Sequence, residues 1–138
     1  MNEKIFEMVA QYKEDSFFTY AEFTDEARVR AEKSLNVILP DQYVEYLKAF
    51  GHGGVAGVEI LGMGCDGAMI FVDSTTLYRG YGLPESLVVV ENCDEWLYCI
   101  DCSNGAVVSW EIGGDVKPEF DCFDDFLLSE YSDAIENL

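Results

Sequence analysis

Basic side chains are scarce in this sequence, which has eight Lys and Arg residues against 27 Asp and Glu residues and a formal net charge of −19. The shortage is greatest in residues 85–138, where 14 acidic residues face one basic residue, Lys117. Such a chain would repel nucleic-acid phosphates and anionic membrane surfaces, so the composition disfavours both as partners. It favours a basic protein partner, whose capture a long-range negative field would speed. The alternative interpretation is that the charge serves solubility alone.

Long hydrophobic runs are also absent, and none approaches the roughly 18 residues of a membrane span. The first segment carries Glu3, Glu7 and Glu14, where a secretory signal would be apolar. We therefore expect a soluble, cytoplasmic protein. Its five cysteines are odd in number, which does not suit a secreted disulfide framework. Reduced thiols, mostly buried as small hydrophobic groups, are the simpler interpretation.

Only one histidine occurs, His52, within the stretch Gly-His-Gly-Gly. A lone histidine in a glycine turn could act as a general base, but no Ser or Cys nucleophile lies near it in the sequence. Gly51 is well placed as the left-handed residue that follows a helix over 41–50, and His52 is then a side chain at the helix end. We favour this structural interpretation over a catalytic one.

Two further motifs could carry chemistry, and both fit poorly. Cys99-x-x-Cys102 resembles a redox pair or half of a zinc site, but strand residues three apart point to opposite faces, and no second such pair exists. The glycines of Gly62-x-Gly64-x-x-Gly67 match a dinucleotide fingerprint, but the next segment predicts a strand where the fingerprint needs a helix. The sequence therefore predicts no catalytic residue, no metal site and no cofactor, and we do not expect an enzyme.

What the sequence has in abundance is apolar side chains: 49% of its 138 residues are hydrophobic and 14% are aromatic, enough for a sizeable core. No linker or repeat divides the chain, so we expect one domain over residues 1–138. Apolar positions at a spacing of three or four predict helices over 2–13, from the N-cap Thr24 to the Leu-Pro at 39–40, over 41–50 and over 123–138. Short apolar runs predict strands over 58–63, 67–74, 87–92, 95–101 and 106–112.

The last two expected strands flank Ser103-Asn104-Gly105, which predicts a hairpin. A two-residue Asn-Gly loop would place an aspartate among apolar side chains. A three-residue loop with Gly105 left-handed pairs Cys102 with Ala106 and sorts the side chains better, so we favour it. The apolar face would then hold Trp96, Tyr98, Ile100, Cys102, Ala106, Val108, Trp110 and Ile112, and the other face Leu97, Cys99, Asp101, Val107, Ser109 and Glu111.

The stretch "AEKSLNVILPDQYVEYLKAFGHGG" resembles the signature of the SUKH superfamily, also called the Smi/Knr-type domain. In that signature a helix with an acidic residue leads to a Leu-Pro, a Tyr-containing helix and a glycine turn. The matching positions are Glu32, Leu35, Leu39, Pro40, Tyr43, Leu47, Gly51 and Gly53. The later segments "LPESLVVV", "EWLYCID" with Gly105 and Val107, and "FDDFLL" extend the resemblance over residues 20–130. One departure is the bend before 96–101, often glycine-rich in the family, which here is Asn92-Cys93-Asp94-Glu95.

The resemblance implies an α+β domain in which N-terminal helices and a C-terminal helix flank a mainly antiparallel sheet. It also implies a binding role, since many bacterial members are immunity proteins that neutralise toxins, often nucleases, and fungal members are scaffolds in cell-wall synthesis signalling. The family has no established catalytic residues to carry over. We therefore expect an immunity protein that binds a cationic toxin domain, in the first instance a nuclease, through an acidic face. The alternative is a non-catalytic regulatory scaffold that binds endogenous proteins.

Two groups of acidic residues form the expected partner-binding site. One surrounds the bend before residues 96–101 and its strands, and the other surrounds a later loop and the start of the last helix. The first group comprises Glu91, Asp94, Glu95 and Asp101, and the second Asp115, Glu119, Asp121, Asp124 and Asp125. If the fold brings the groups together, they would resemble a phosphate track that plugs a nuclease. If it does not, they are a scattered, solvated surface.

A second possible interface is the aromatic segment that contains Phe17, Phe18, Tyr20 and Phe23. The segment is expected to be a loop or a short strand. Aromatic side chains more often pack in a core, but they also supply the anchors of protein interfaces. We therefore keep this segment as a second candidate surface.

Overall fold

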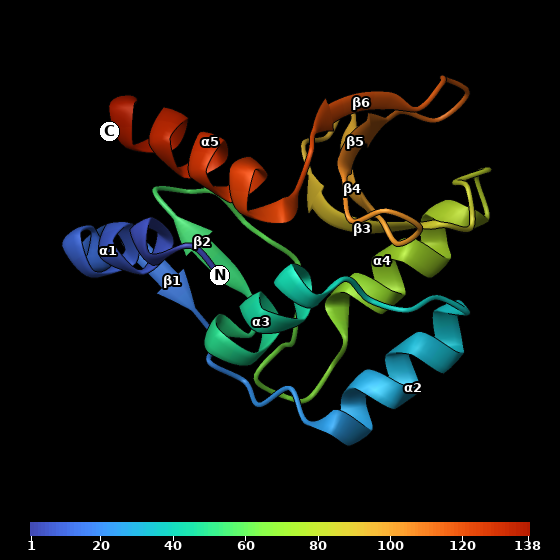
Figure 1. Ribbon diagram of the computed structural model, residues 1–138, viewed down its shortest axis with the longest axis horizontal. Coiled ribbons are helices and arrows are strands. Elements are labelled where there is room, and N and C mark those ends of the chain that lie inside the picture. The colour runs from blue at the N-terminus through green and yellow to red at the C-terminus, as the bar shows by residue number, and fades with distance from the viewer.

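Two antiparallel sheets and five helices make up the computed structural model, which describes residues 1–138 (Figure 1). The helices are α1 (Glu3–Gln11), α2 (Asp25–Leu35), α3 (Asp41–Phe50), α4 (Ile70–Arg79) and α5 (Phe123–Glu136), with a 3-10 turn at Lys13–Asp15. The strands are β1 (Ser16–Phe18), β2 (Gly53–Val55), β3 (Leu87–Asn92), β4 (Leu97–Asp101), β5 (Val107–Trp110) and β6 (Lys117–Phe120). β1 pairs with β2, and β3, β4, β5 and β6 pair in that order, always antiparallel, which confirms the expected α+β class. None of the helices is long and apolar enough to cross a membrane.

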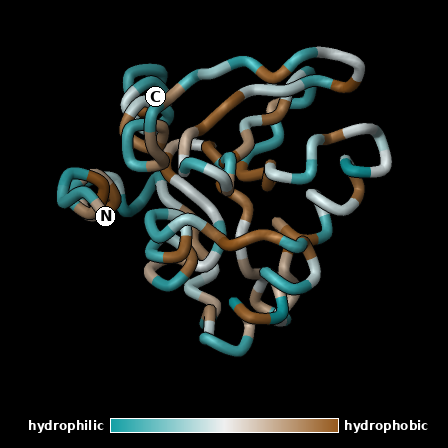
Figure 2. The backbone as a smooth tube through the Cα atoms, turned by 45° about the vertical axis from the view of Figure 1, so that its right-hand side comes forward, coloured by the Kyte–Doolittle hydropathy of each residue, from teal (hydrophilic) through white to brown (hydrophobic).

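One hydrophobic core joins the helices to the four-stranded sheet. Tyr43 of α3 is fully buried, and its ring packs edge-to-face on Phe71 of α4 and Phe123 of α5, with centroids 5.6 and 5.3 Å apart. Tyr98 of β4 packs on Phe126 of α5 at 5.1 Å. Figure 2 shows hydrophobic stretches of the chain running through the middle of the molecule, with mostly hydrophilic stretches at its edges. The core therefore fixes the sheet against α5.

Local sequence signals begin α2 and end α3 where expected, but α2 ends at Leu35, before the Leu-Pro at 39–40, with Asn36 left-handed at a φ of +55°. The Thr24 hydroxyl oxygen accepts a hydrogen bond from the Ala27 N–H at 3.0 Å, which makes Thr24 the N-cap of α2. A Glu32 carboxylate oxygen accepts a hydrogen bond from the Leu39 N–H at 2.7 Å and so ties the Leu-Pro segment back to α2. Gly51 follows α3 with a φ of +76°, in the left-handed region that was expected.

The expectation of a strand over 67–74 is wrong, because most of this segment belongs to α4. Its β-branched and aromatic composition is typical of strands, but tertiary packing overrides such propensities. Phe71 and Thr75, four residues apart, are both buried on one helix face. The Thr75 hydroxyl donates to the Phe71 carbonyl at 2.7 Å and accepts from the Val89 N–H of β3 at 3.0 Å. This face of α4 is therefore attached to the sheet.

Two other strand boundaries also differ from expectation. The segment 58–63 is extended chain with only two isolated bridges, from Ile60 to Gly53 and from Met63 to Met69. β2 precedes that segment instead. β6 has no counterpart among the expected strands, because its residues are mostly exposed and include Pro118, so no apolar alternation marks it.

The register of the β4–β5 hairpin differs from the expected one. Leu97 pairs with Trp110, and the Asp101 N–H donates to the Ala106 carbonyl at 2.8 Å, so the loop has four residues rather than three. Gly105 is left-handed as expected, with a φ of +78°. The three-residue loop was favoured because it gathered apolar side chains on one face and kept Asp101 off that face. All residues of β5 are in fact buried, so both faces are covered and hydrophobicity does not select the register.

Candidate functional site

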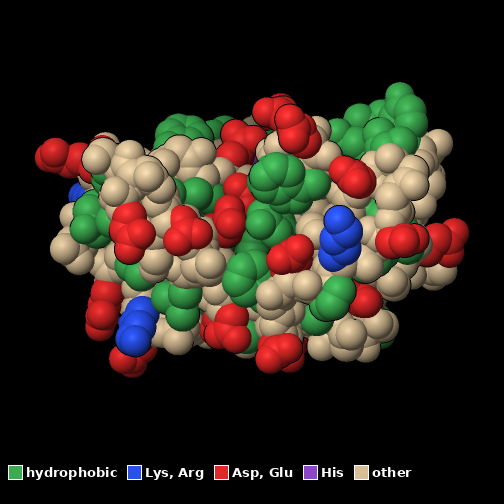
Figure 3. All heavy atoms as spheres, turned by 90° about the horizontal axis from the view of Figure 1, so that it is seen from above, with side chains coloured by type: hydrophobic (Ala, Val, Ile, Leu, Met, Phe, Trp, Pro, Cys, Tyr) green, Lys and Arg blue, Asp and Glu red, His purple; other side chains and the backbone are tan.

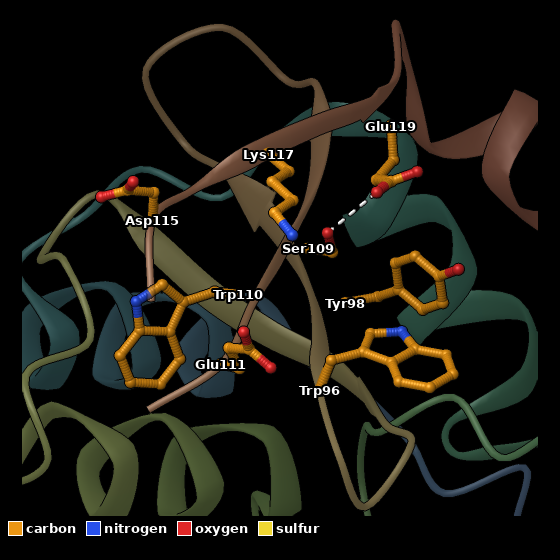
Figure 4. Close-up of a pocket in the computed structure, with 8 residues that line it drawn as sticks. All are labelled: Trp96, Tyr98, Ser109, Trp110, Glu111, Asp115, Lys117 and Glu119. Atoms are coloured by element: carbon orange, nitrogen blue, oxygen red, sulfur yellow. Dashed lines mark hydrogen bonds between the residues drawn. The ribbon is translucent and has the colours of Figure 1, made fainter. Parts of the chain in front are cut away.

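Two adjoining hollows open at the end of the four-stranded sheet that carries the β3–β4 bend and the β5–β6 loop. Their volumes are about 250 and 210 Å³. The first is lined by Trp96, Tyr98, Ser109, Trp110, Glu111, Asp115, Lys117 and Glu119 (Figure 4). The second is lined by Tyr78, Asp94, Glu95, Trp96, Leu97, Trp110, Glu111 and Ile112. Because Trp96, Trp110 and Glu111 border both hollows, we describe them together as the acidic groove.

The strand register makes several side chains of the first hollow direct neighbours on adjacent strands. Tyr98 of β4 pairs with Ser109 of β5, and Ser109 pairs with Lys117 of β6, so these three side chains share one face of the sheet. Trp96 lies two residues before Tyr98 and Glu111 two residues after Ser109, so both continue that face (Figure 4). The end of the sheet thus gathers residues from three strands.

The expected register would have separated these residues. It placed Trp96 and Tyr98 on the face opposite Ser109 and Glu111, whereas the four-residue loop puts all of them on the same face. Glu111 and the aromatic lining are therefore site residues that the sequence analysis missed. The available signal was the spacing of two residues between Trp96 and Tyr98 and between Ser109 and Glu111. Once the length of the hairpin loop is known, this spacing places all four side chains on one face of the sheet.

The aromatic lining combines a buried anchor with an exposed ring. Trp110 is 4% exposed and belongs to the core, whereas Trp96 is 40% exposed. The Trp96 ring meets Tyr98 edge-to-face, with centroids 6.1 Å apart and an interplanar angle of 89°. Burial and the Glu130 carboxylate raise the pKa of Tyr98, so its hydroxyl stays protonated to a higher pH than that of an ordinary tyrosine. The exposed part of the Trp96 ring offers both apolar area and a π face to a ligand in the groove.

Carboxylates outnumber cations in the groove. Its charged members are Asp94, Glu95, Glu111, Asp115 and Glu119 against Lys117. The Ser109 hydroxyl donates to one Glu119 oxygen at 2.8 Å. The side chains of Glu111 and Asp115 make no hydrogen bond or ion pair within the chain, and Lys117 has no carboxylate within 4.0 Å. This excess of carboxylates suits the binding of a cation.

Comparison with protein-family models shows which family nearly the whole chain matches. A SUKH model described as SMI1-KNR4 cell-wall matches residues 2–132. The chain belongs to the SUKH family. This confirms the resemblance seen in the sequence and supports an immunity or cell-wall-related domain. The SUKH signature residues have structural roles here: Glu32 holds the Leu-Pro segment, and the buried Tyr43 hydroxyl donates to the Leu61 carbonyl at 2.6 Å.

Five of the nine acids expected at the binding site of this SUKH domain lie outside the groove: Asp101, Asp121, Asp124, Asp125 and the buried Glu91. Asp101 is at the opposite end of β4, where one carboxylate oxygen accepts from the Ser103 N–H and hydroxyl at 2.9 and 2.6 Å. Asp124 lies in the first turn of α5 and accepts from the Asn2 N–H at 2.9 Å, and burial raises its pKa. The exposed acids beside it are Asp121 and Asp125. Figure 3 shows acidic side chains scattered over one face around a band of hydrophobic ones, rather than one continuous acidic track.

Glu91 is the expected site residue that departs most from its predicted place. It is 8% exposed, and burial together with the neighbouring Glu130 carboxyl raises its pKa to about 9. Glu91 is therefore mostly neutral at pH 7 and adds little charge to any surface. Its Oε1 atom and the Tyr131 hydroxyl are buried without hydrogen-bond partners. We therefore remove Glu91 from the binding surface, which leaves Asp94, Glu95, Asp115 and Glu119 of the predicted set, joined by Glu111.

His52, Cys99 and Cys102 occupy structural positions, but only Cys99 of the five free cysteines is buried and Cys65 is exposed, so the expectation that most thiols are buried is wrong. His52 is buried, and its Nδ1 accepts a hydrogen bond from the Gly62 N–H at 2.9 Å, while Nε2 lies 3.7 Å from a Glu59 carboxylate oxygen. Burial raises the pKa of the Cys99 and Cys102 thiols to about 12, which makes them poor nucleophiles at neutral pH. No group of three or more His, Cys, Asp or Glu side chains in the protein is placed to hold one metal ion.

The glycine fingerprint at residues 62–67 lies in a different structural context from the one expected. A helix, α4, does follow Gly62, Gly64 and Gly67, contrary to the expected strand. The preceding segment is not a strand of a parallel sheet, however, so the βαβ context of a dinucleotide site is missing. Gly62 has a steric role instead, because a Cβ atom there would lie 1.7 Å from the Gly51 carbonyl oxygen.

The aromatic segment divides between core and surface. Phe23 is buried, and Phe18 stacks on Phe50 of α3 with centroids 4.5 Å apart. Phe17 and Tyr20 are exposed. Figure 1 places β1, which carries Phe17, and the four-stranded sheet at opposite ends of the long axis, so this patch is separate from the acidic groove.

Proposed function

We propose that this SUKH domain is an immunity protein that neutralises a basic toxin domain, in the first instance a nuclease, by binding it through the acidic groove. The observation that supports this proposal is the groove itself, where three carboxylates share the first hollow with an unpaired lysine, two more line the adjoining hollow, and an exposed tryptophan borders both. A partner rich in Lys and Arg would find complementary charge there. Membership of a family with immunity proteins is consistent with such a role.

Neutralisation would proceed by occlusion rather than by chemistry. A nuclease binds the phosphates of its substrate with basic side chains, and the groove carboxylates can pair with those side chains in place of phosphate. The net charge of −13 on residues 85–138 would speed encounter, and this steering would weaken as salt increases. No cofactor or nucleic acid takes part in this mechanism. We place it in the cytoplasm, where a delivered nuclease would reach its substrates.

A regulatory scaffold is the second candidate function. The exposed rings of Phe17 and Tyr20 favour it, because each offers apolar contact area on a segment far from the acidic groove. A protein with two such surfaces can join two partners. Several housekeeping proteins captured through the aromatic patch would support the scaffold, whereas one toxin-like protein captured through the groove would support immunity.

The test is a pull-down from the native host at about 50 mM and about 500 mM salt, with the bound proteins identified by mass spectrometry. We expect one basic, toxin-like protein that is retained at low salt and is weakened when Asp94 and Glu95 are changed to Lys. Changing the exposed Glu7 and Glu14 to Lys is the matched control, since it alters the net charge equally but lies outside the groove. A partner that binds equally in both salts and ignores the groove substitutions would overturn the acidic-groove mechanism.

A further inference from the structure

We propose that the acidic groove receives an arginine side chain of the protein partner, with the guanidinium plane on the exposed Trp96 ring and its N–H groups paired with the adjacent carboxylates. The inference rests on the proposed function in one respect, namely that the partner is a basic protein. It goes further because it names one side chain and one place for it.

The Trp96 ring provides the platform. Its indole is exposed, and the edge-to-face contact with Tyr98 fixes how the ring is presented. Cations are attracted to the face of an aromatic ring, most strongly to tryptophan. A partner side chain that covers this ring would also remove exposed apolar surface from water. The ring therefore attracts a cation that also carries apolar surface.

The carboxylates around the first hollow provide the acceptors. Glu111 and Asp115 have no hydrogen-bond partner within the chain, and Glu119 uses one oxygen for Ser109 and keeps the other available. Figure 4 shows these three carboxylates arranged around the hollow, with the Lys117 ammonium among them. Since Lys117 pairs with none of them, a second cation can enter without breaking an existing ion pair.

The shape of the site favours arginine over lysine. A guanidinium is planar, stacks on aromatic rings and donates to carboxylates through two parallel N–H groups, whereas an ammonium is a compact and strongly hydrated point charge. The first hollow has a volume of about 250 Å³, below the roughly 300–1,000 Å³ of sites for drug-sized ligands. It therefore suits a single side chain rather than a cofactor or a helix.

The chain offers a direct readout, because its two tryptophans are Trp96 and Trp110 and both line the groove. Indole N–H signals in NMR therefore report on this site alone. The probe is the blocked peptide Ser-Gly-Arg-Gly-Ser, compared with the same peptide carrying lysine or the neutral isostere citrulline. We expect saturable shifts of the Trp96 signal with the arginine peptide, about threefold weaker binding of the lysine peptide and no saturation with citrulline.

Three variants make the test specific. The pair Glu111→Gln and Glu119→Gln should abolish saturation by the arginine peptide, and Trp96→Phe should weaken it by about threefold. The control Glu7→Gln, exposed on α1, should leave it unchanged. Circular dichroism of each variant establishes that it is folded, and the peptide comparison on the unmodified protein needs no variant at all.

Two results would overturn the inference: equal binding of the citrulline or lysine peptide, or arginine binding that survives loss of both glutamates. If a basic partner is still captured in a salt-sensitive way while the arginine peptide fails, the inference falls and the proposed function stands. If the arginine peptide binds the groove but no basic partner is captured from the host, the proposed function falls, and the groove keeps its arginine selectivity without the immunity role.

Discussion

His52 is the side chain that links the glycine turn after α3 to the extended segment before α4. Its Nδ1 is the acceptor for the buried Gly62 N–H. Changing His52 to Ala leaves that N–H without a partner, and we expect the free energy of unfolding to fall by about 1–3 kcal/mol, measured by urea denaturation. Glu59→Gln removes the exposed partner of Nε2 and should change stability by less than about 1 kcal/mol. Equal losses in the two variants would contradict this role of Nδ1.

Glu91 should give the protein a specific dependence of stability on pH. Its pKa rises from an ordinary 4.5 to about 9 on folding, so the folded state binds more protons between these values. The free energy of unfolding therefore contains a contribution that falls as the pH rises through this window. Glutamine resembles the protonated side chain, so Glu91→Gln should become more stable than the unmodified protein as the pH increases from about 5 to about 8.5.

Thermal unfolding at several pH values in that range measures the effect. Glu7→Gln, on an exposed face of α1, is the control for the loss of one negative charge. A stability difference between Glu91→Gln and the unmodified protein that stays constant with pH, as in this control, would show that Glu91 is not held in its neutral form.

At the scale of elements, the crossing of two backbone segments at Gly62 and Gly51 holds α3 against the start of α4. A Cβ atom on Gly62 would lie 1.7 Å from the Gly51 carbonyl oxygen, and backbone cannot yield as a side chain can. We expect Gly62→Ala to lower the free energy of unfolding by about 3 kcal/mol or more, or to prevent folding. Gly80→Ala is the control, since Gly80 has helical angles and its nearest contact is 3.1 Å. Similar stability of both variants by chemical denaturation would contradict this constraint.

The helices were largely predictable and the sheet was only partly so. A helix with one buried stripe and a clear cap, such as α2 after Thr24, carries its own boundaries in the sequence. The apolar segment 67–74 does not carry such boundaries in its sequence. A short run of buried apolar residues is compatible with either a strand or a helix, so its composition does not reveal which one forms. Hairpin register failed for a related reason: with both faces of β5 buried, no polar face remained to reveal it.

At the scale of the whole molecule, the charge bias was visible in the sequence, and the arrangement of the acidic groove was not. The sequence analysis indicated the bend at Asp94 and Glu95 and the loop at Asp115, and both reach the acidic groove. The sequence analysis could not distinguish the buried Glu91 from these exposed acids, since burial depends on which face of a strand points into the core. It also missed Trp96, because the expected register turned that ring away from Glu111. Composition thus indicated the charge of the candidate surface, and strand pairing determined which side chains meet in the groove.

The most direct test of the groove as a protein-binding surface is the association rate constant with the purified basic partner at about 50 mM and about 500 mM salt. We expect the rate to fall by about tenfold or more as salt increases, and to fall similarly at low salt when Asp94, Glu95 and Glu111 are changed to Lys. Changing Glu3, Glu7 and Glu14 to Lys, with the same change in net charge, should leave the rate within about threefold. A rate that is independent of salt, or that falls equally in both variants, would contradict binding through the acidic groove.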